Sequence, residues 1–285
     1  MSLRVKQLLA QDTATSGLLP GALPSLRDLF PAQTGKPDQH GPIVGIFVSS
    51  GDAGVAEICA GAGFDYLLID GEHSPLSLES IQSQLRAIAG YPVLSVVRVP
   101  HNDPVLIKQY LDLGVQTLIV PMVDTPDQAR AAASAVAYPP DGVRGLGSAL
   151  ARSGRWSRIP DYLARARHTL TLLVQIESHT AVNHAAEILA TDGVDGVFIG
   201  PSDLSASMGL LGRQTHPEVI AAVTQVIAQA NAAGKIVGVN AFHADQARDY
   251  VAAGADFVNV SADVAILARG TEKLVADWGI EQEAP

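Results

Sequence analysis

The sequence predicts an α/β protein, a single (β/α)8 TIM barrel preceded by an N-terminal extension. Short apolar runs alternate with Ala-rich helical patterns from residue 43 to about residue 275. There are eight such runs, the number of strands in this barrel. The runs are almost wholly apolar, as parallel strands are when both of their faces are covered. The expected strands are 43–48, 66–69, 93–97, 117–120, 171–176, 196–199, 236–239 and 257–260.

Helical patterns fill the intervals between these strands. Three of them end at a glycine shortly before the next strand, namely Gly63, Gly114 and Gly254, and glycine readily adopts the left-handed conformation that ends a helix. A doubly wound open sheet is the structural rival. No Gly-x-Gly-x-x-Gly follows the first strand, which weakens a dinucleotide-binding interpretation. The expected helices are 54–60, 78–89, 105–113, 127–136, 180–189, 218–232 and 244–252.

The first 42 residues differ from the rest in composition and lack the alternation of apolar runs and helical patterns. Gly, Pro, Ser and Thr punctuate them, with one amphipathic stretch at 23–30. We therefore expect an N-terminal extension over 1–42 and the barrel over 43–285. The longest loop, 137–159, separates the fourth helix from the fifth strand, and a loop of this length inside a compact domain is often functional.

Composition excludes several classes of partner. The chain has 285 residues, 47% of them hydrophobic, enough for a large core, and its formal net charge of -10 argues against nucleic-acid binding. Its single cysteine permits no intramolecular disulfide. No run of 18 apolar residues indicates a membrane span. We expect a cytoplasmic protein with neither a nucleic-acid nor a membrane partner.

Polar residues follow several of the predicted strands. Chemistry in such barrels takes place at the carboxyl ends of the strands, so these positions are candidate site residues. The richest clusters follow the second, third, fifth and sixth strands. They comprise Asp70, Glu72, His73, Arg98, Gln175, Glu177, Ser202 and Asp203.

Glu177 and Asp203 form a plausible metal-binding pair. They follow adjacent strands, and two carboxylates with water and substrate oxygens suit a hard cation such as Mg²⁺ or Mn²⁺. The alternative is that both carboxylates cap helices, because each precedes a helical stretch.

Arg98 and His73 could bind or protonate a small substrate. Arg98 suits an enolate or carboxylate oxygen; the alternative is a structural ion pair with Asp70 or Glu72. His73 could act as a general acid or base, or it could be a loop histidine that bonds to the backbone.

Lysine provides negative evidence. None of the five lysines lies at the carboxyl end of a predicted strand, where a Schiff base would require one. A metal is therefore favoured as the electron sink for enolate chemistry. No glycine-rich turn follows the last two strands, which makes a phosphorylated substrate less favoured.

Several segments together resemble a known family. They are residues 61–73, which end in Asp-Gly-Glu-His, Val97-Arg98, and residues 120–123, 138–145, 147–156, 174–177 and 196–204. In order and spacing they are similar to the HpcH/HpaI family of class II 2-oxo acid aldolases, over roughly residues 43 to 270.

This resemblance implies the chemistry of the site. Glu177 and Asp203 would hold a divalent cation (Mg²⁺, Mn²⁺ or Co²⁺). Pyruvate would bind Arg98 and Gln175, with its carboxylate on backbone N–H groups near Ser202 and Asp203. His73, oriented by Asp112, would assist proton transfer. Asp70 would support the residues that contact the substrate without contacting it itself.

The resemblance also implies a homo-oligomer, a hexamer built as a trimer of dimers, in which the last helix is exchanged between partners. The sequence departs from the family pattern at three places: Asn240 replaces an aliphatic residue near the aldehyde subsite, Pro100-His101 replaces a Ser-Trp type of pair, and the N-terminal extension is long.

The expected reaction is reversible cleavage of a 4-hydroxy-2-oxo acid into pyruvate and an aldehyde through the pyruvate enolate. An alternative on the same scaffold is an oxaloacetate decarboxylase or enolate-transferring synthase. A third possibility is a barrel that binds a metabolite without catalysis. The strand-end positions of Glu177, Asp203, Arg98 and His73 argue against that third possibility.

Overall fold

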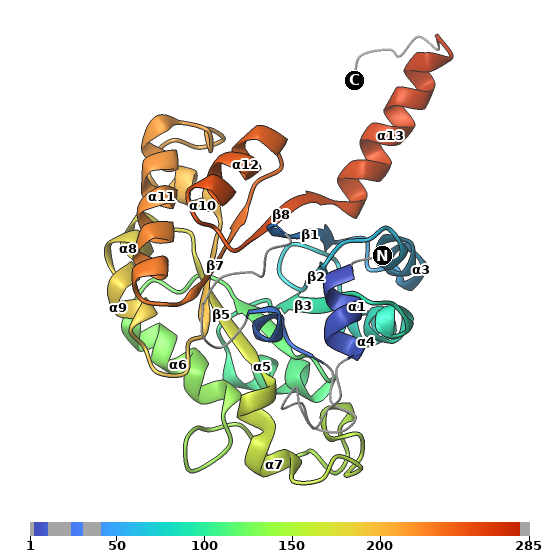
Figure 1. The fold of residues 1–285 in the computed structure, drawn as a ribbon, viewed down its shortest axis with the longest axis vertical. Helices are drawn as coiled ribbons and strands as arrows, with labels where there is room; N and C mark the ends of the chain where they lie inside the picture. The colour runs from blue at the N-terminus through green and yellow to red at the C-terminus, as the bar shows by residue number, and fades with distance from the viewer. Residues whose placement is uncertain (1–2, 11–23, 31–40, 280–285) are drawn as a thin grey trace.

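A computed structural model describes residues 3–10, 24–30 and 41–279 of the chain. Eight parallel strands close a barrel in chain order, with helices around it (Figure 1), which confirms the predicted fold. The strands are β1 (Ile43–Val48), β2 (Tyr66–Asp70), β3 (Leu94–Arg98), β4 (Thr117–Val120), β5 (Thr171–Ile176), β6 (Gly196–Ile199), β7 (Ile236–Asn240) and β8 (Phe257–Ala262).

Three strands reach one residue further than the apolar pattern predicted. They end at Asp70, Arg98 and Asn240. The ladder continues through these polar residues because each faces a partner on the next strand: Asp70 pairs in register with Arg98, and Asn240 with Asn259. These side chains are thereby fixed on rigid backbone rather than on loops.

The predicted helices agree with the structure except between β5 and β6, and the structure adds α10 (Pro201–Ser207) and α13 (Asp263–Asp277), which were not among them. Between β5 and β6 the expected single helix is divided at His184, whose Nδ1 atom lies 2.9 Å from the carbonyl oxygen of Asp124. The outer helices are α3 (Ala53–Gly61), α4 (Leu78–Ala87), followed by η2 (Ile88–Gly90), α5 (Pro104–Asp112), α6 (Pro126–Val136), α8 (His179–Asn183), α9 (Ala185–Leu189), α10 (Pro201–Ser207), α11 (Pro217–Ala232), α12 (Ala244–Ala252) and α13 (Asp263–Asp277).

Large aromatic rings fill the barrel interior beside glycines. A Cβ atom on Gly45 would lie 2.3 Å from the Tyr66 ring, and one on Gly238 would lie 2.0 Å from the Phe257 ring. Phe257 also stacks on Phe198, with ring centroids 5.8 Å apart. These glycines therefore make room for the packed interior, and alternate residues of each strand pack outward against the helices.

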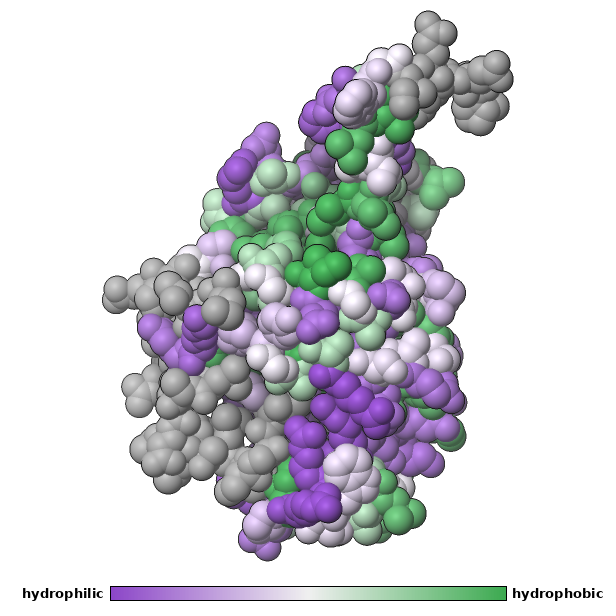
Figure 2. Space-filling model, turned by 90° about the vertical axis from the view of Figure 1, so that its right-hand side faces the viewer, coloured by the Kyte–Doolittle hydropathy of each residue, from purple (hydrophilic) through white to green (hydrophobic). Residues whose placement is uncertain are grey.

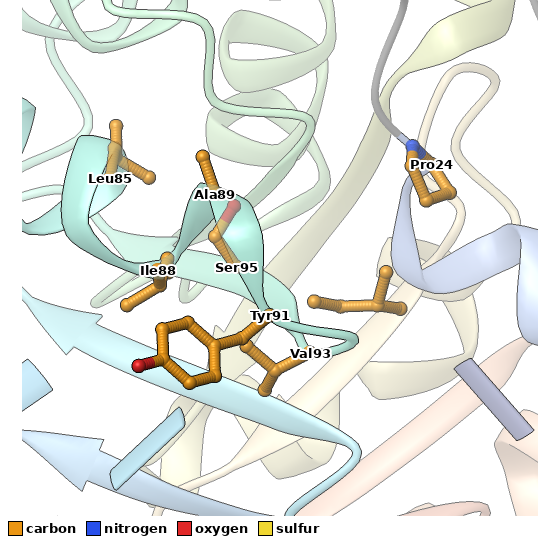
Figure 3. Close-up of a pocket in the computed structure, with 8 residues that line it drawn as sticks. Pro24, Leu85, Ile88, Ala89, Tyr91, Val93 and Ser95 are labelled. Atoms are coloured by element: carbon orange, nitrogen blue, oxygen red, sulfur yellow. The ribbon is translucent and has the colours of Figure 1, made fainter. Parts of the chain in front are cut away.

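N-terminal segments close the end of the barrel at which the strands begin. They form α1 (Leu3–Ala10) and η1 (Leu26–Leu29). The backbone N–H of Leu26 donates to Thr117 Oγ1 (2.8 Å), and that of Arg27 donates to Thr171 Oγ1 (3.0 Å). Close by, Pro24 borders a small apolar hollow with η2 and the start of β3 (Figure 3). The division of the chain at residue 42 stays a prediction.

The long loop between α6 and β5 leads into the start of β5 and lies with α7 (Tyr162–Arg165) at the bottom of the view in Figure 1. Besides α7 it contains η3 (Arg152–Gly154) and η4 (Ala166–Thr169). The loop is therefore remote from the carboxyl ends of its own barrel.

Helix α13 projects away from the barrel (Figure 1) instead of folding back along it. Asp263 is its one buried residue; the Asp263 carboxylate accepts from the N–H groups of Ser49 and Ser50 at 2.8 and 3.1 Å. Apolar side chains gather where α13 leaves the barrel (Figure 2). The outer faces of β1 and β8 are left open, in a groove with α12. Val44, Phe242, Ala247, Val251, Val258 and Val260 are among its lining residues.

Across the described ranges, no helix has the length and apolar character needed to cross a membrane.

Candidate active site

The carboxyl ends of the strands bring polar side chains together at the barrel mouth. On β2, β3 and β5 the residues that alternate with the outward-packing ones end in Asp70, Arg98 and Gln175. All three are buried, as is Glu177, which directly follows β5. The sequence prediction that these residues share one end of the barrel is therefore confirmed by their positions.

Arg98 is held in a network of two carboxylates. Its Nε and Nη2 atoms donate to Asp70 Oδ1 (2.9 Å) and Oδ2 (2.8 Å), while Nη1 lies 2.9 Å from Glu72 Oε2. The ion pair considered as an alternative is thus present. A guanidinium has five N–H donors, and two of those of Arg98 are used in hydrogen bonds to Asp70. The contact with Glu72 is an ion pair in which Glu72 Oε2 accepts no hydrogen bond, so donors remain for a ligand. The guanidinium also lies over the Phe47 ring, 5.1 Å from its centroid.

This network keeps both charges in place despite burial. Burial alone would raise the pKa of Asp70, but the hydrogen bonds and charge of Arg98, with N–H groups of Glu72 and His73, lower it below its ordinary value. Burial would likewise lower the pKa of Arg98, and the two carboxylates together with Glu177 raise it instead. Arg98 is therefore a permanently charged, oriented donor.

Glu177 is the most perturbed carboxyl group of the mouth. Burial raises its pKa to about 7, with further contributions from the charges of Glu72 and Asp203. Its Oε1 atom accepts from the backbone N–H of Met122 (2.7 Å), and its Oε2 atom accepts from Gln175 Nε2. Both donors are neutral groups, and Glu177 forms no ion pair among the described residues.

Gly200 opens the space beside this carboxylate. A Cβ atom there would lie 3.1 Å from Glu177 Oε2 and 3.2 Å from Gln175 Nε2. Helix α10 begins at the next residue, with Ser202 and Asp203 exposed in its first turn. N–H groups in the first turn of a helix have no partner within the helix, so these two point to solvent or to a ligand.

The donor set fits a hard divalent cation with few protein ligands. The charge of Asp203 raises the pKa of Glu177, and of Glu72 as well, so the carboxylates are close enough to repel one another. Gln175 Oε1 is buried without a partner. No group of three or more His, Cys, Asp and Glu side chains suited to a metal occurs among the described residues. Two carboxylates supplemented by neutral oxygens match the preference of Mg²⁺.

His73 and Asp112 do not meet within one chain. His73 lies in the loop after β2, two-thirds exposed, with Nε2 3.9 Å from Glu72 Oε2. Asp112 is the last residue of α5, and a nine-residue helix that leaves the mouth carries its end about 13 Å away. There Asp112 accepts from Arg144 Nη2 (3.1 Å). Any pairing of His73 with Asp112 therefore requires a second copy of the chain.

Several contributors were missed in the choice of site residues. Glu72 was included in the predicted strand-end cluster but was given no role beyond a possible ion pair with Arg98. Gly200 gave no signal, because its role is the absence of a side chain near Glu177. Phe47 and Asn259 lie inside apolar runs, where only their inward orientation reveals them.

A closed parallel barrel whose mouth combines a braced arginine with clustered carboxylates defines a barrel enzyme suited to stabilising an oxyanion. Residues 44–269 match the family described as HpcH/HpaI aldolase/citrate lyase. A 4-hydroxy-2-oxo-heptane-1,7-dioate aldolase from Salmonella newport (strain SL254) is 52% identical over 242 residues, which is 85% of this chain and 92% of that protein. The chain belongs to the HpcH/HpaI aldolase/citrate lyase family, and it is a carbon–carbon lyase of the aldolase type.

Solved structures agree with this assignment. A family member from Burkholderia cenocepacia J2315 is 41% identical with a TM-score of 0.80, over 83% of this chain and 94% of that one. The HpcH/HpaI aldolase from Desulfitobacterium hafniense DCB-2 is 28% identical with a TM-score of 0.78, over 86% and 96%. Macrophomate synthase, 24% identical with a TM-score of 0.72 over 83% of each chain, shares the fold.

Proposed function

We propose that this aldolase reversibly cleaves a 4-hydroxy-2-oxo acid to pyruvate and an aldehyde through the enolate of pyruvate. The observation that carries the proposal is the Arg98–Asp70 ion pair, which fixes a guanidinium at the same mouth as Glu177 and Asp203. The substrate class is that of the Salmonella relative, whose name denotes a 4-hydroxy-2-oxo acid.

In the cleavage direction the C4 hydroxyl loses its proton and the C3–C4 bond breaks. The aldehyde leaves, the electron pair of the broken bond forms the C2–C3 double bond, and the π pair of the C2 carbonyl moves onto the 2-oxo oxygen. The N–H donors of Arg98 that do not bond to Asp70 stabilise that oxygen as it becomes negative. Asp70 holds the guanidinium in position, so little reorganisation accompanies the charge transfer. Protonation at C3 then gives pyruvate.

Glu177 and Asp203 are the residues that would hold a divalent cation, assisted by Gln175. When bound, the cation supplies electrophilic stabilisation of the oxygen that gains negative charge. The first-turn N–H groups of Ser202 and Asp203 would bind the pyruvate carboxylate at the start of α10, next to the space that Gly200 leaves open.

Proton transfer is assigned to His73, which is exposed at the mouth. Its partner Asp112 lies at the opposite end of the same barrel, so we propose that Asp112 comes from a neighbouring copy. Two features support this. Arg144, with a fully buried side chain, fixes one Asp112 oxygen, and the Asp112 side chain is still 28% exposed.

The assembly proposed is a homo-oligomer, a hexamer built as a trimer of dimers, in which α13 of one copy covers the groove of another. Both surfaces are apolar and open in the single chain. The exposed side chains on or just after α13 include Ile266 (54%), Leu267 (64%), Leu274 (61%) and Trp278 (82%). We further propose a cytoplasmic location, which the single cysteine favours.

The test is exchange of the C3 protons of pyruvate for deuterium, followed by NMR with Mg²⁺ or Mn²⁺ and again with EDTA. Exchange that requires the cation supports the enolate step and the cation together. Exchange that continues in EDTA would contradict the cation, and no exchange in either condition would contradict the enolate. If exchange occurs but no aldehyde is turned over, oxaloacetate decarboxylation becomes the better candidate.

A further inference from the structure

A pair of asparagines stands at the mouth, on the side opposite Arg98. Asn240 ends β7 and pairs in register with Asn259 on β8. Both lie on the interior face of their strands, in line with Ile236 and Phe257, which belong to the inner core. Strand β7 adjoins β6, which leads directly into α10 and Asp203. The pair therefore borders the barrel mouth next to the strand that leads to the proposed cation and pyruvate positions.

The contacts of the pair orient the amide of Asn240. Asn259 is fully buried, and its Nδ2 atom donates to Asn240 Oδ1 (3.5 Å) and to the carbonyl oxygen of Ser261 (3.3 Å). Because the Oδ1 atom of Asn240 accepts from its neighbour, the NH2 group of Asn240 is the part left for a ligand. Asn240 is half-buried, so this donor is partly withdrawn from water yet reachable.

Burial of Asn259 leaves one polar atom of its amide without a hydrogen bond, which costs free energy. Its Oδ1 atom is buried without a hydrogen-bond partner, an arrangement that proteins rarely tolerate without a reason. An aliphatic residue would fill the same position in the interior without that cost. The Nδ2 atom of Asn259 supplies two bonds in return, one to the backbone of Ser261 and one to Asn240, and only the second reaches the barrel mouth.

The surroundings decide which ligand group fits. Phe47 on β1 contacts Phe242, which lies two residues beyond Asn240, with ring centroids 6.3 Å apart. Neither ring nor either amide carries a positive charge. Arg98, over the Phe47 ring, already pairs with Asp70 and Glu72. Among the described residues of the single chain, the side chains named on this wall offer no free cation to a carboxylate tail, and an alkyl tail would leave the amide of Asn240 unpaired.

We infer that Asn240 binds an uncharged hydroxyl oxygen on the aldehyde half of the substrate, and that Asn259 is the residue that positions it. The enzyme is thereby selective for hydroxyaldehydes, and hence for 4-hydroxy-2-oxo acids that carry a further hydroxyl group. This inference rests on the aldolase reaction proposed above.

The test compares addition of pyruvate to three aldehydes by the wild-type protein: propanal, lactaldehyde (propanal with one added hydroxyl) and succinate semialdehyde. We expect kcat/KM to be about tenfold higher for lactaldehyde than for propanal, as for one oriented hydrogen bond, and higher than for succinate semialdehyde. Equal values for lactaldehyde and propanal, or a preference for succinate semialdehyde, would overturn the inference.

Variants identify the residue responsible. Asn240→Leu should bring the lactaldehyde-to-propanal ratio close to one, Asn240→Gln should recover part of it, and Asn259→Ala should lower it by loosening the amide of Asn240. Asn231→Leu, an exposed position at the far end of α11, is the matched control and should keep the ratio. A ratio that persists in Asn240→Leu would overturn the inference.

Exchange at C3 of pyruvate needs no aldehyde, so it serves as the reference rate for every variant. If the wild-type protein exchanges the C3 protons of pyruvate but does not prefer lactaldehyde to propanal, only this inference is overturned. Absence of exchange in the wild type removes the proposed aldolase reaction, and the inference falls with it.

Discussion

Arg98 and Asp70 form a two-point ion pair between the ends of adjacent strands, with Nε to Oδ1 at 2.9 Å and Nη2 to Oδ2 at 2.8 Å. The two residues are register partners in the barrel sheet, so the backbone as well as the side chains fixes their geometry. A guanidinium held in this way can meet a developing oxyanion without first being reoriented.

Replacement of Arg98 should therefore stop enolate formation while the fold persists. Arg98→Ala should abolish C3 proton exchange of pyruvate. Arg98→Lys, which keeps the charge but cannot bond at two points, should lower the rate by about 100-fold or more. NMR of exchange measures both, with thermal unfolding as the control for folding. Exchange at the wild-type rate in Arg98→Ala would exclude Arg98 from the mechanism.

The raised pKa of Glu177 should make the cation-free protein less stable as the pH increases. The folded state holds this proton more tightly than the unfolded state. The contribution of Glu177 to the free energy of unfolding is therefore fully present below pH 4.5. It should fall as the pH passes to about 7. The cost above that range is on the order of 3 kcal/mol.

Glu177→Gln is neutral at every pH and should remove that fall. In EDTA the variant should match the wild type at pH 4 and be the more stable at pH 8, as measured by urea unfolding at both pH values. Added Mg²⁺ should stabilise the wild type at pH 8 far more than the variant. Equal stability of the two proteins in EDTA at pH 8 would contradict the buried, uncompensated carboxylate.

Pairing of His73 and Asp112 across copies predicts complementation. His73→Ala and Asp112→Asn should each be nearly inactive as homo-oligomers, because each disrupts every site. Co-expressed assemblies should recover activity at about a quarter of the sites, as random mixing in a symmetric oligomer requires. Mixing the two purified proteins without subunit exchange is the control. Activity of the co-expressed assembly no higher than that of the single variants would contradict a shared site.

Exchange of α13 between copies predicts that charge on its apolar side chains disrupts assembly. The double change Leu267→Glu and Leu274→Glu should shift the mass measured by analytical ultracentrifugation to a smaller species. Ala276→Glu, an exposed position on the opposite face of the same helix, should leave the mass unchanged. An unaltered mass in the double variant would place the interface elsewhere.

The order of the strands and the end of the barrel that carries chemistry followed from the sequence alone. Both depend on local pattern, because an apolar run covered on two faces can only be an interior strand, and the polar residue that ends it lies at the mouth. Asp70, Arg98 and Glu177 were found in this way. The family resemblance added expected roles that periodicity does not contain, such as the pairing of His73 with Asp112.

Only the tertiary structure decided which of these residues touch. Strand register joins Asp70 to Arg98 and Asn240 to Asn259 across 28 and 19 positions of sequence, and no local pattern encodes register. The direction of α5 placed Asp112 at the far end of the barrel from His73. The tertiary structure also decided that α13 leaves its own barrel, so that its apolar side chains and the groove beside β1 and β8 both stay open in the single chain.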